Sequence, residues 1–312
     1  MNGRSGIASP VFAIDLEGGE RMPEISHVVA DGEAGRTVKS LALREMALSR
    51  SLFSSLKFRG GLLLDGQPVH ADVRLSPGQV LTARWEEKCG GAPAPCPAPF
   101  AIVWEDENYY VLEKPAPLPT LASPRQGGPA LESALYAHLG CPADFVFRPV
   151  NRLDKGTSGL MAAAKNAHAQ QLLQRRLHTD SFRREYLALC AGAPPQAAGV
   201  IDLPIGKGPG VRREVRMDGR RAVTRYQTER TANGLSLLRL RLETGRTHQI
   251  RVHVSALSCP ILGDYLYGSA DPRLPGRFAL HACRLSFSHP LTGERLCFDS
   301  PLPREIAALL AE

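Results

Sequence analysis

The chain contains 312 residues, of which 43% are hydrophobic and 22% are charged, so its composition is that of a globular protein long enough for more than one domain. Its seven cysteines are scattered without a CxxC pair, which argues against a disulfide framework and against a zinc site. No apolar run approaches the ~20 residues of a membrane span and no secretory leader pattern opens the chain, so we expect a cytoplasmic protein without membrane contact.

The N-terminal region predicts two short helices behind a tail. Residues 1 to 24 carry no readable pattern, and we expect them to form an N-terminal tail. Apolar side chains then recur at helical spacing over residues 37 to 47 and over residues 49 to 58. The second run begins at Ser49 or Ser51, either of which could cap a helix because a serine hydroxyl accepts a hydrogen bond from a free backbone N–H.

A hairpin and a linker follow these helices. The segment LLLDGQPVHADVRL contains Asp65 and Gly66, a dipeptide that favours a tight turn between two strands. Residues 89 to 99, CGGAPAPCPAP, hold too much proline and glycine for a helix or a strand. We therefore predict a small α/β module over residues 25 to 88, a linker over residues 89 to 99, and a second domain over residues 100 to 312.

The second domain is dominated by short strands. An apolar run predicts a buried strand, and alternation of apolar with polar side chains predicts antiparallel strands with one polar face. Such runs occur at residues 160–164, 222–229, 238–243 and 284–298. Helical patterns occupy residues 166–178, with Asn166 as the expected cap, and 247–257, with Thr247 as the expected cap. The predicted class is α+β, a mixed and largely antiparallel sheet with flanking helices.

One acidic residue stands in the basic, glycine-containing run RLDKGTSGLM at residues 152 to 161. Gly156 and Gly159 permit sharp turns, and the apolar strand that follows would anchor the turn. Such a turn can present the carboxylate of Asp154 to an anionic ligand, although an ordinary acidic turn has the same spacing.

Arginines occur in adjacent pairs elsewhere in the chain, and the net charge is +7. A polyanion is the natural partner for such clusters, whereas a solvated basic face is the alternative reading. The pairs are at residues 175 and 176, 183 and 184, 212 and 213, and 220 and 221.

The basic run belongs to a series of five blocks, which in this order resembles the RluA-type pseudouridine synthases. The blocks are RLDKGTSGL, RREYLAL at 183–189, TGRTHQIRVH at 244–253, GDYLYG at 263–268 and ALHACRLSFSHPLTGE at 279–294. The resemblance runs from about residue 100 to residue 303 and implies the pseudouridine synthase fold. It also implies an isomerase that converts uridine to pseudouridine in structured RNA, without a cofactor or a metal.

The resemblance also implies roles for individual residues. Asp154 is the catalytic carboxylate, which either attacks C1′ or removes the C2′ proton, and Tyr186 packs on the base and helps to remove the C5 proton. Arg246 is the basic partner of the carboxylate, with Arg251 in reserve for this role. Both arginines could instead contact RNA phosphates, and Arg251 is counted among the RNA-binding residues. Arg152 fills the space that the extruded uridine leaves, whereas a salt bridge to Asp154 is the alternative reading.

The segment SRSLFSSLKFRGGLLLDGQPV, with the later SPGQVLTARW, resembles the alpha-L RNA-binding domain. This second resemblance implies that Arg50, Lys57 and Arg59 of the second helix face RNA phosphates. We expect ribosomal RNA rather than transfer RNA as the substrate, and a monomeric protein.

One position departs from the family pattern, which usually has histidine where this chain has Asn151. Asparagine forms hydrogen bonds but carries no charge. This departure leaves open a second reading, a catalytically silent RNA-binding protein that retains the fold. A glycoside hydrolase is a third and weaker reading, because no second acid stands in a comparable turn.

Overall fold

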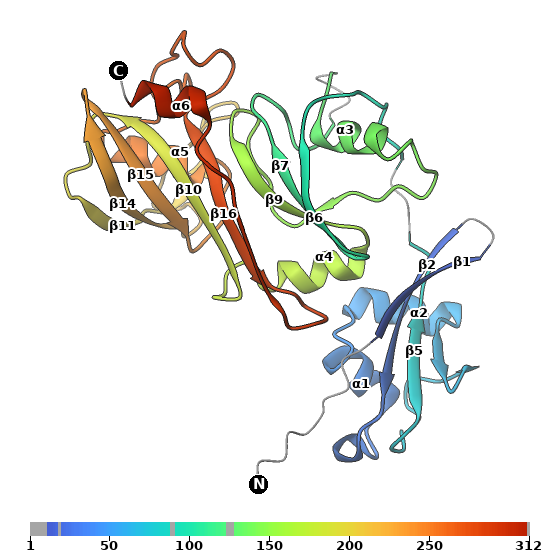
Figure 1. The fold of residues 1–312 in the computed structure, drawn as a ribbon. Coiled ribbons are helices and arrows are strands. Elements are labelled where there is room, and N and C mark those ends of the chain that lie inside the picture. The colour runs from blue at the N-terminus through green and yellow to red at the C-terminus, as the bar shows by residue number, and fades with distance from the viewer. Residues whose placement is uncertain (1–10, 18–19, 88–90, 123–127, 311–312) are drawn as a thin grey trace.

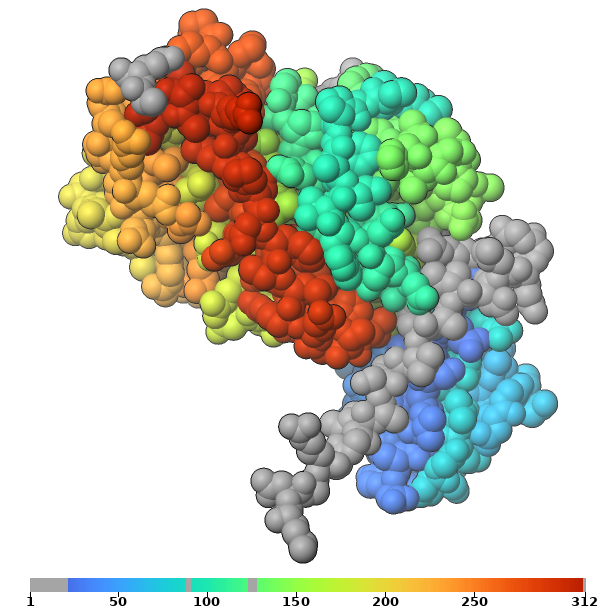
Figure 2. Space-filling model, in the orientation of Figure 1, coloured from blue at the N-terminus to red at the C-terminus, as the bar shows by residue number. Residues whose placement is uncertain are grey.

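The computed structural model describes residues 11–17, 20–87, 91–122 and 128–310. It has two domains. Figure 1 shows the smaller one next to helix α4 (Ala167–Gln174) of the larger one, and Figure 2 shows the two domains as a smaller and a larger lobe. Both domains combine helices with mainly antiparallel sheets, so the predicted α+β class is confirmed.

The N-terminal domain is a five-stranded antiparallel sheet in the order β1-β2-β5-β3-β4, covered by two helices. Its strands are β1 (Val11–Glu17), β2 (Glu20–Val28), β3 (Leu62–Leu64), β4 (Gln67–Pro68) and β5 (Val80–Arg84), and its helices are α1 (Val38–Arg44) and α2 (Arg50–Arg59). A separate hydrophobic core lies between the sheet and the helices.

The prediction of a tail is wrong for residues 11–17 and 20–24, because these residues form β1 and the first half of β2. β2 pairs with β5 from Glu24 to Val28, so the sheet of the module continues into this segment. The remaining residues of the predicted tail, 1 to 10 with 18 and 19, lie outside the described residues.

The local signals in this domain are confirmed. The hydroxyl of Ser49 accepts a hydrogen bond from the N–H of Leu52 at 3.0 Å and so caps α2. The hairpin between β3 and β4 turns at Asp65 and Gly66, whose φ angles of 51° and 81° are those of a tight turn with two left-handed residues.

The second domain is built on a ten-stranded sheet in which β9 and β16 are parallel and the other recorded strand pairs are antiparallel. The main path runs β11-β14-β15-β10-β16-β9-β7-β6, with β17 beside β16 and β8 beside β9. The strands are β6 (Ala101–Glu105), β7 (Tyr109–Lys114), β8 (Arg148–Pro149), β9 (Ser158–Ala164), β10 (Phe182–Ala191), β11 (Ala198–Asp202), β14 (Val223–Ala232), β15 (Leu235–Leu242), β16 (Leu280–Ser288) and β17 (Arg295–Asp299).

Four helices and a small hairpin complete this domain. The helices are α3 (Leu131–His138), α4 (Ala167–Gln174), α5 (Gln249–Ala256) and α6 (Arg304–Leu309), and the hairpin strands are β12 (Ile205–Lys207) and β13 (Arg213–Val215). Asn166 caps α4 as predicted, since its side chain accepts from the N–H of Ala169 at 2.7 Å. The predicted cap of α5 at Thr247 is wrong, because the N-cap is His248 in a left-handed conformation with φ of 59°.

The two domains meet at the carboxylate of Glu87, which follows β5 and is 1% exposed. It accepts hydrogen bonds from the guanidinium of Arg148 at 2.8 and 2.9 Å and from the N–H of Ala167 at 3.1 Å. Arg148 lies on β8, immediately before the turn that holds Asp154, so the N-terminal domain is anchored next to this turn.

Candidate active site

The turn that carries Asp154 lies between β8 and β9 and is held on several sides. The backbone carbonyl of Asp154 accepts from the N–H of Thr157 at 3.0 Å, and the carbonyl of Leu153 accepts from the hydroxyl of Thr120 at 2.9 Å. A Cβ atom at Gly156 would lie 2.6 Å from the ring of Phe278, so this close approach requires glycine. The backbone of the turn is therefore fixed, while the Asp154 side chain remains 31% exposed.

The parallel pairing of β9 with β16 fixes the other end of this turn. Gly159 has φ of 106°, and a Cβ atom there would lie 2.3 Å from the carbonyl oxygen of Ala282 on β16. Only glycine tolerates both the conformation and the contact. The glycines singled out in the sequence thus position the turn that holds Asp154.

Arg251 on α5 is the cation next to this carboxylate. Its Nη1 donates to Oδ2 of Asp154 at 3.2 Å, while its Nε and Nη2 donate to the two oxygens of Asp264 at 2.7 and 2.8 Å. Burial lowers the pKa of Arg251, but the hydrogen bonds and charge of the two carboxylates outweigh it and the pKa is raised. Arg251 therefore stays charged beside Asp154.

The predicted pairing of Asp154 with Arg246 is wrong. Arg246 precedes α5, and its Nε donates to the carbonyl of Arg221 at 3.0 Å. Arg251, which was the alternative, takes the position because α5 starts only at Gln249 and turns the arginine inward, where its side chain is 5% exposed. Arg246 still lines the cavity above Asp154.

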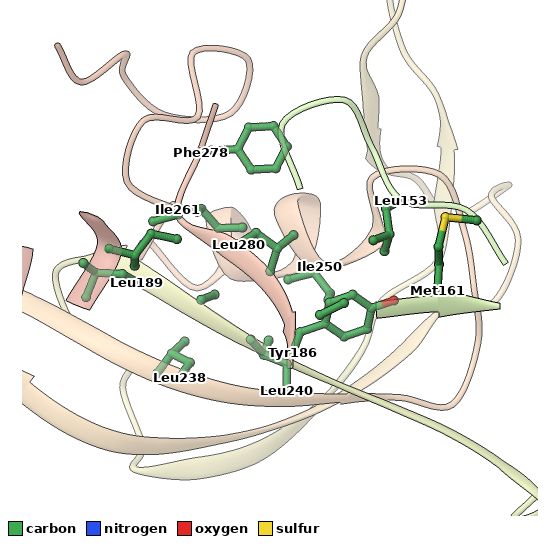
Figure 3. Close-up of a cluster of buried hydrophobic side chains, with 14 of the residues drawn as sticks. Leu153, Met161, Tyr186, Leu189, Leu238, Leu240, Ile250, Ile261, Phe278 and Leu280 are labelled. Carbon is green, nitrogen blue, oxygen red and sulfur yellow. The ribbon is translucent and has the colours of Figure 1, made fainter. Parts of the chain in front are cut away.

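Tyr186 on β10 lies below this cavity with its side chain in the main hydrophobic core. Figure 3 shows its ring next to Ile250, with Leu153 and Leu280 in the same cluster. Burial raises the pKa of Tyr186, so its phenol stays protonated at neutral pH. Its position is that of a side chain that can contact a base in the cavity from the core side.

His248 is a site residue that the sequence reasoning missed. Its Nε2 lies 3.9 Å from Oδ2 of Asp154, and its Nδ1 lies 2.8 Å from the hydroxyl of Tyr267. Burial lowers the pKa of His248, so this imidazole is mainly neutral at pH 7. Asp264, in the block GDYLYG, was given no role in the sequence analysis, and its contact with Arg251 places it behind the turn that holds Asp154. The signal available for His248 was its place in the same block as Arg246 and Arg251.

A cavity of about 680 Å³ brings most of the predicted residues together. Its lining includes Arg152, Asp154, Tyr186 and Arg246, and a smaller adjoining cavity reaches Arg251. Arg152 is exposed and makes no hydrogen bond or ion pair with a described residue, so the alternative of an Arg152–Asp154 salt bridge does not hold.

The three basic residues predicted on the second helix are exposed on the other domain and do not share one face. Arg50 and Lys57 are seven residues apart, about two helical turns, whereas Arg59 is about two and a half turns from Arg50. Arg59 lines the interdomain cavity, where its guanidinium is 3.8 Å from Glu86. The structure therefore separates Arg59 from the other two.

Two classes of site are not found in the described parts of the chain. No helix there is long and apolar enough to cross a membrane. No group of three or more histidine, cysteine, aspartate or glutamate side chains is placed there to hold a metal ion.

A family model and the similar known proteins all point to one family of enzymes. Residues 108–256 match the family model described as RNA pseudouridylate synthase. The chain is 36% identical over 281 residues to the Uncharacterized RNA pseudouridine synthase YjbO of Bacillus subtilis, which covers 88% of this chain and 98% of that protein. It is 35% identical over 304 residues to the Ribosomal large subunit pseudouridine synthase D of Xanthomonas campestris pv. campestris, with 91% of each chain covered.

A solved structure agrees with these sequence relatives. The human RNA Pseudouridylate Synthase Domain Containing 4 matches with a TM-score of 0.55 and 26% identity, over 67% of this chain and 91% of that chain. The resemblance seen in the sequence is thus confirmed. The chain belongs to the RluA-type family of RNA pseudouridine synthases, which are isomerases.

Proposed function

We propose that this protein converts uridine to pseudouridine in a structured RNA, with Asp154 as the catalytic carboxylate. The observation that carries the proposal is the place of Asp154, partly exposed at a large cavity and 3.2 Å from the guanidinium of Arg251. The hydrogen bond from this guanidinium orients the carboxylate at the cavity. Asp154 is therefore available as a nucleophile or a base.

The isomerisation breaks the bond between N1 and C1′, turns the detached uracil in place, and joins its C5 to C1′. Uracil departs from C1′ as a delocalised anion, but it stays in the pocket and is not released. One carboxylate therefore suffices, whereas glycoside hydrolysis uses two. The carboxylate of Asp154 either attacks C1′ or accepts the C2′ proton. Tyr186 packs against the base and assists removal of the C5 proton, while Arg251 holds Asp154 in place.

A uridine in folded RNA must leave its stack before this chemistry, which costs a few kcal/mol. Arg152 is exposed at the same cavity as Asp154. A planar guanidinium can stack on the bases next to the gap and contact a phosphate. We therefore assign Arg152 to the extrusion step and not to bond cleavage.

The proposed substrate is ribosomal RNA, because several similar proteins are named large-subunit pseudouridine synthases. The N-terminal domain is proposed to bind RNA as an alpha-L module through Arg50, Lys57 and Arg59. Action as a monomer in the cytoplasm, without a metal or a cofactor, belongs to the same proposal. Carbodiimide mapping of pseudouridine in cellular RNA, with and without the gene, tests it and identifies the uridine. A map that does not change in any RNA class contradicts the proposal.

The rival reading is an RNA-binding protein without activity, and Asn151 was the feature that favoured it. In the structure Oδ1 of Asn151 accepts from the N–H of Ala162 on β9 at 3.0 Å. This contact supports the turn and needs no charge. The replacement of the usual histidine therefore gives no reason to expect a loss of activity.

A further inference from the structure

Arg184 is a buried cation in the active-site cavity that has no role so far. It lies on β10 two residues before Tyr186, is 7% exposed, and lines the same cavity as Asp154. Its Nε and Nη2 are buried without a hydrogen-bond partner, and within the described residues no carboxylate forms an ion pair with it. The other arginine deep in this site, Arg251, is in contrast satisfied by two carboxylates.

A buried charge without a partner is costly, so such a group is normally paired or coordinated. The surroundings of Arg184 include an aromatic ring but, among the described residues, no carboxylate paired with it. The ring of Phe182 is 5.8 Å from its guanidinium carbon, and burial together with the charge of Arg184 lowers the pKa of His178. At Gly245 a Cβ atom would lie 3.4 Å from Nη1, so the absence of a side chain there leaves room beside the guanidinium. An anion from outside the protein would complete this site.

Asn151 supplies a second, independent donor without a partner. Its carboxamide is 6% exposed and is oriented by the bond from the N–H of Ala162 to Oδ1. Nδ2 is consequently fixed as a donor, and it is buried with no acceptor in the described part of the chain. Asn151 lines the same cavity as Arg184 and Asp154.

We propose that Arg184, with Asn151 as a second donor, binds a phosphate of the RNA backbone next to the extruded uridine. The inference rests on the proposed function only in taking this cavity as the place where the uridine binds. A guanidinium matches a phosphate with two parallel hydrogen bonds, and the negative charge supplies the counter-ion that Arg184 lacks. A neutral base would satisfy the donors but would leave the charge uncompensated.

The test uses the pentanucleotide AAUAA, whose single uridine fixes the register, and a series in which each phosphate in turn is a neutral methylphosphonate. Binding to the full-length protein is measured by fluorescence anisotropy. For the wild type, neutralising one phosphate beside the uridine should weaken binding by about tenfold or more, the range of a hydrogen bond to a charged group. Arg184→Gln should weaken binding of the unmodified RNA by a similar factor and should no longer distinguish the modified RNA, as expected when both changes remove one interaction.

The matched control is Arg284→Gln. Arg284 lies opposite Glu185 in the β10–β16 pair, on the other face of the sheet from Arg184, and is paired with Asp299. This control should keep the preference of the wild type. Asn151→Asp replaces the free donor by an acceptor and should weaken binding in the same way as Arg184→Gln.

Thermal unfolding separates a ligand site from a structural role. Removing an uncompensated buried charge should leave the melting temperature of Arg184→Gln unchanged or higher. The proposal is overturned if no neutralised phosphate weakens the wild type, if Arg184→Gln keeps the preference, or if Arg184→Gln melts substantially lower. If Arg184→Gln binds RNA as the wild type does but has an altered pH profile of activity, the proposal is also overturned. Arg184 would then act on the Tyr186 phenol and not on a phosphate. None of the binding measurements needs turnover, so failure of the proposed function would be seen separately, in the pseudouridine assay.

Discussion

Arg251 lies between two carboxylates and binds them unequally: it grips Asp264 with two short hydrogen bonds and reaches Asp154 with one longer one. Asp264 is fully buried, whereas the Asp154 side chain is 31% exposed. The bidentate pair fixes the guanidinium, and the third nitrogen is left to orient the carboxylate that we propose as catalytic. The buried pair of Arg251 and Asp264 therefore supports the position of the accessible Asp154 side chain.

The first prediction separates Arg251 from Arg246. Arg251→Gln should abolish turnover and lower the free energy of unfolding by about 3–5 kcal/mol, because the buried Asp264 loses its counter-charge. Adding Asp264→Asn should restore much of the stability without restoring activity. Arg246→Gln should change stability by less than about 0.5 kcal/mol, because Arg246 is only partly buried and its recorded hydrogen bond is to the carbonyl of Arg221. Chemical denaturation measures the stability of these variants, and single-turnover assays measure their activity. An inactive Arg246→Gln beside an active Arg251→Gln/Asp264→Asn protein would reverse the assignment.

Lys114 should make stability depend on pH. It is fully buried at the end of β7, and burial lowers its pKa to about 7. Between about pH 7 and the ordinary lysine pKa of about 10.4, the unfolded chain then binds more protons than the folded chain. Its contribution to stability therefore rises with pH in this window, by at most about 1.4 kcal/mol per pH unit.

Denaturation at pH 7, 8 and 9 measures this slope. Lys114→Met should have a flatter slope than the wild type, and Lys207→Met, which removes an exposed lysine of β12, should not. Equal slopes in the wild type and Lys114→Met would show that Lys114 is charged in the folded protein throughout this range.

Arg152 should matter most when the uridine is stacked. Arg152→Ala removes the side chain proposed to fill the gap, so turnover of a stem-loop should fall by about tenfold more than turnover of an unstructured RNA, which needs no extrusion. Lys155→Ala removes a neighbouring exposed charge of the same turn and should affect both RNAs equally. A parallel loss on both RNAs in Arg152→Ala would assign this residue to general RNA affinity.

The basic residues of α2 can be tested in the full-length protein by the salt dependence of RNA binding. Each phosphate contact removed should reduce the log-log slope by about 0.7 to 0.9. Arg50→Gln/Lys57→Gln should therefore lower the slope by nearly twice that amount. Arg59→Gln, whose side chain faces Glu86 in the interdomain cavity, should lower it less. If all of these slopes coincide with that of the wild type, the N-terminal domain does not hold RNA through α2.

Sequence patterns predicted those parts of the fold that local interactions determine. The buried strand β9, the Ser49 and Asn166 caps and the Asp65–Gly66 turn all depend on neighbouring residues. β2 was missed because it pairs with β5, more than 50 residues later in the chain, and β1 was missed with it because β1 pairs with β2. Pro23 interrupts the strand pattern of β2 and hides it in the sequence.

In the candidate site, too, the features that local interactions determine could be predicted and the others could not. The two glycines of the turn and its aspartate could be read directly, since their roles depend on local backbone geometry. The choice between Arg246 and Arg251 could not, because it depends on where α5 begins, and the left-handed His248 delays that start. In the sequence Arg184 was one member of an adjacent arginine pair, and only its burial without a partner distinguishes it from the others.

The most direct test of the account is pseudouridine formation by Asp154→Asn on an RNA that the wild-type protein modifies. The substitution keeps the size of the side chain and removes its charge, in a turn whose backbone is held by other contacts. We expect a folded protein that binds this RNA with an affinity near that of the wild type and forms no pseudouridine above background. A folded Asp154→Asn protein that retains a sizeable fraction of wild-type pseudouridine formation would contradict the assignment of Asp154 as the catalytic carboxylate.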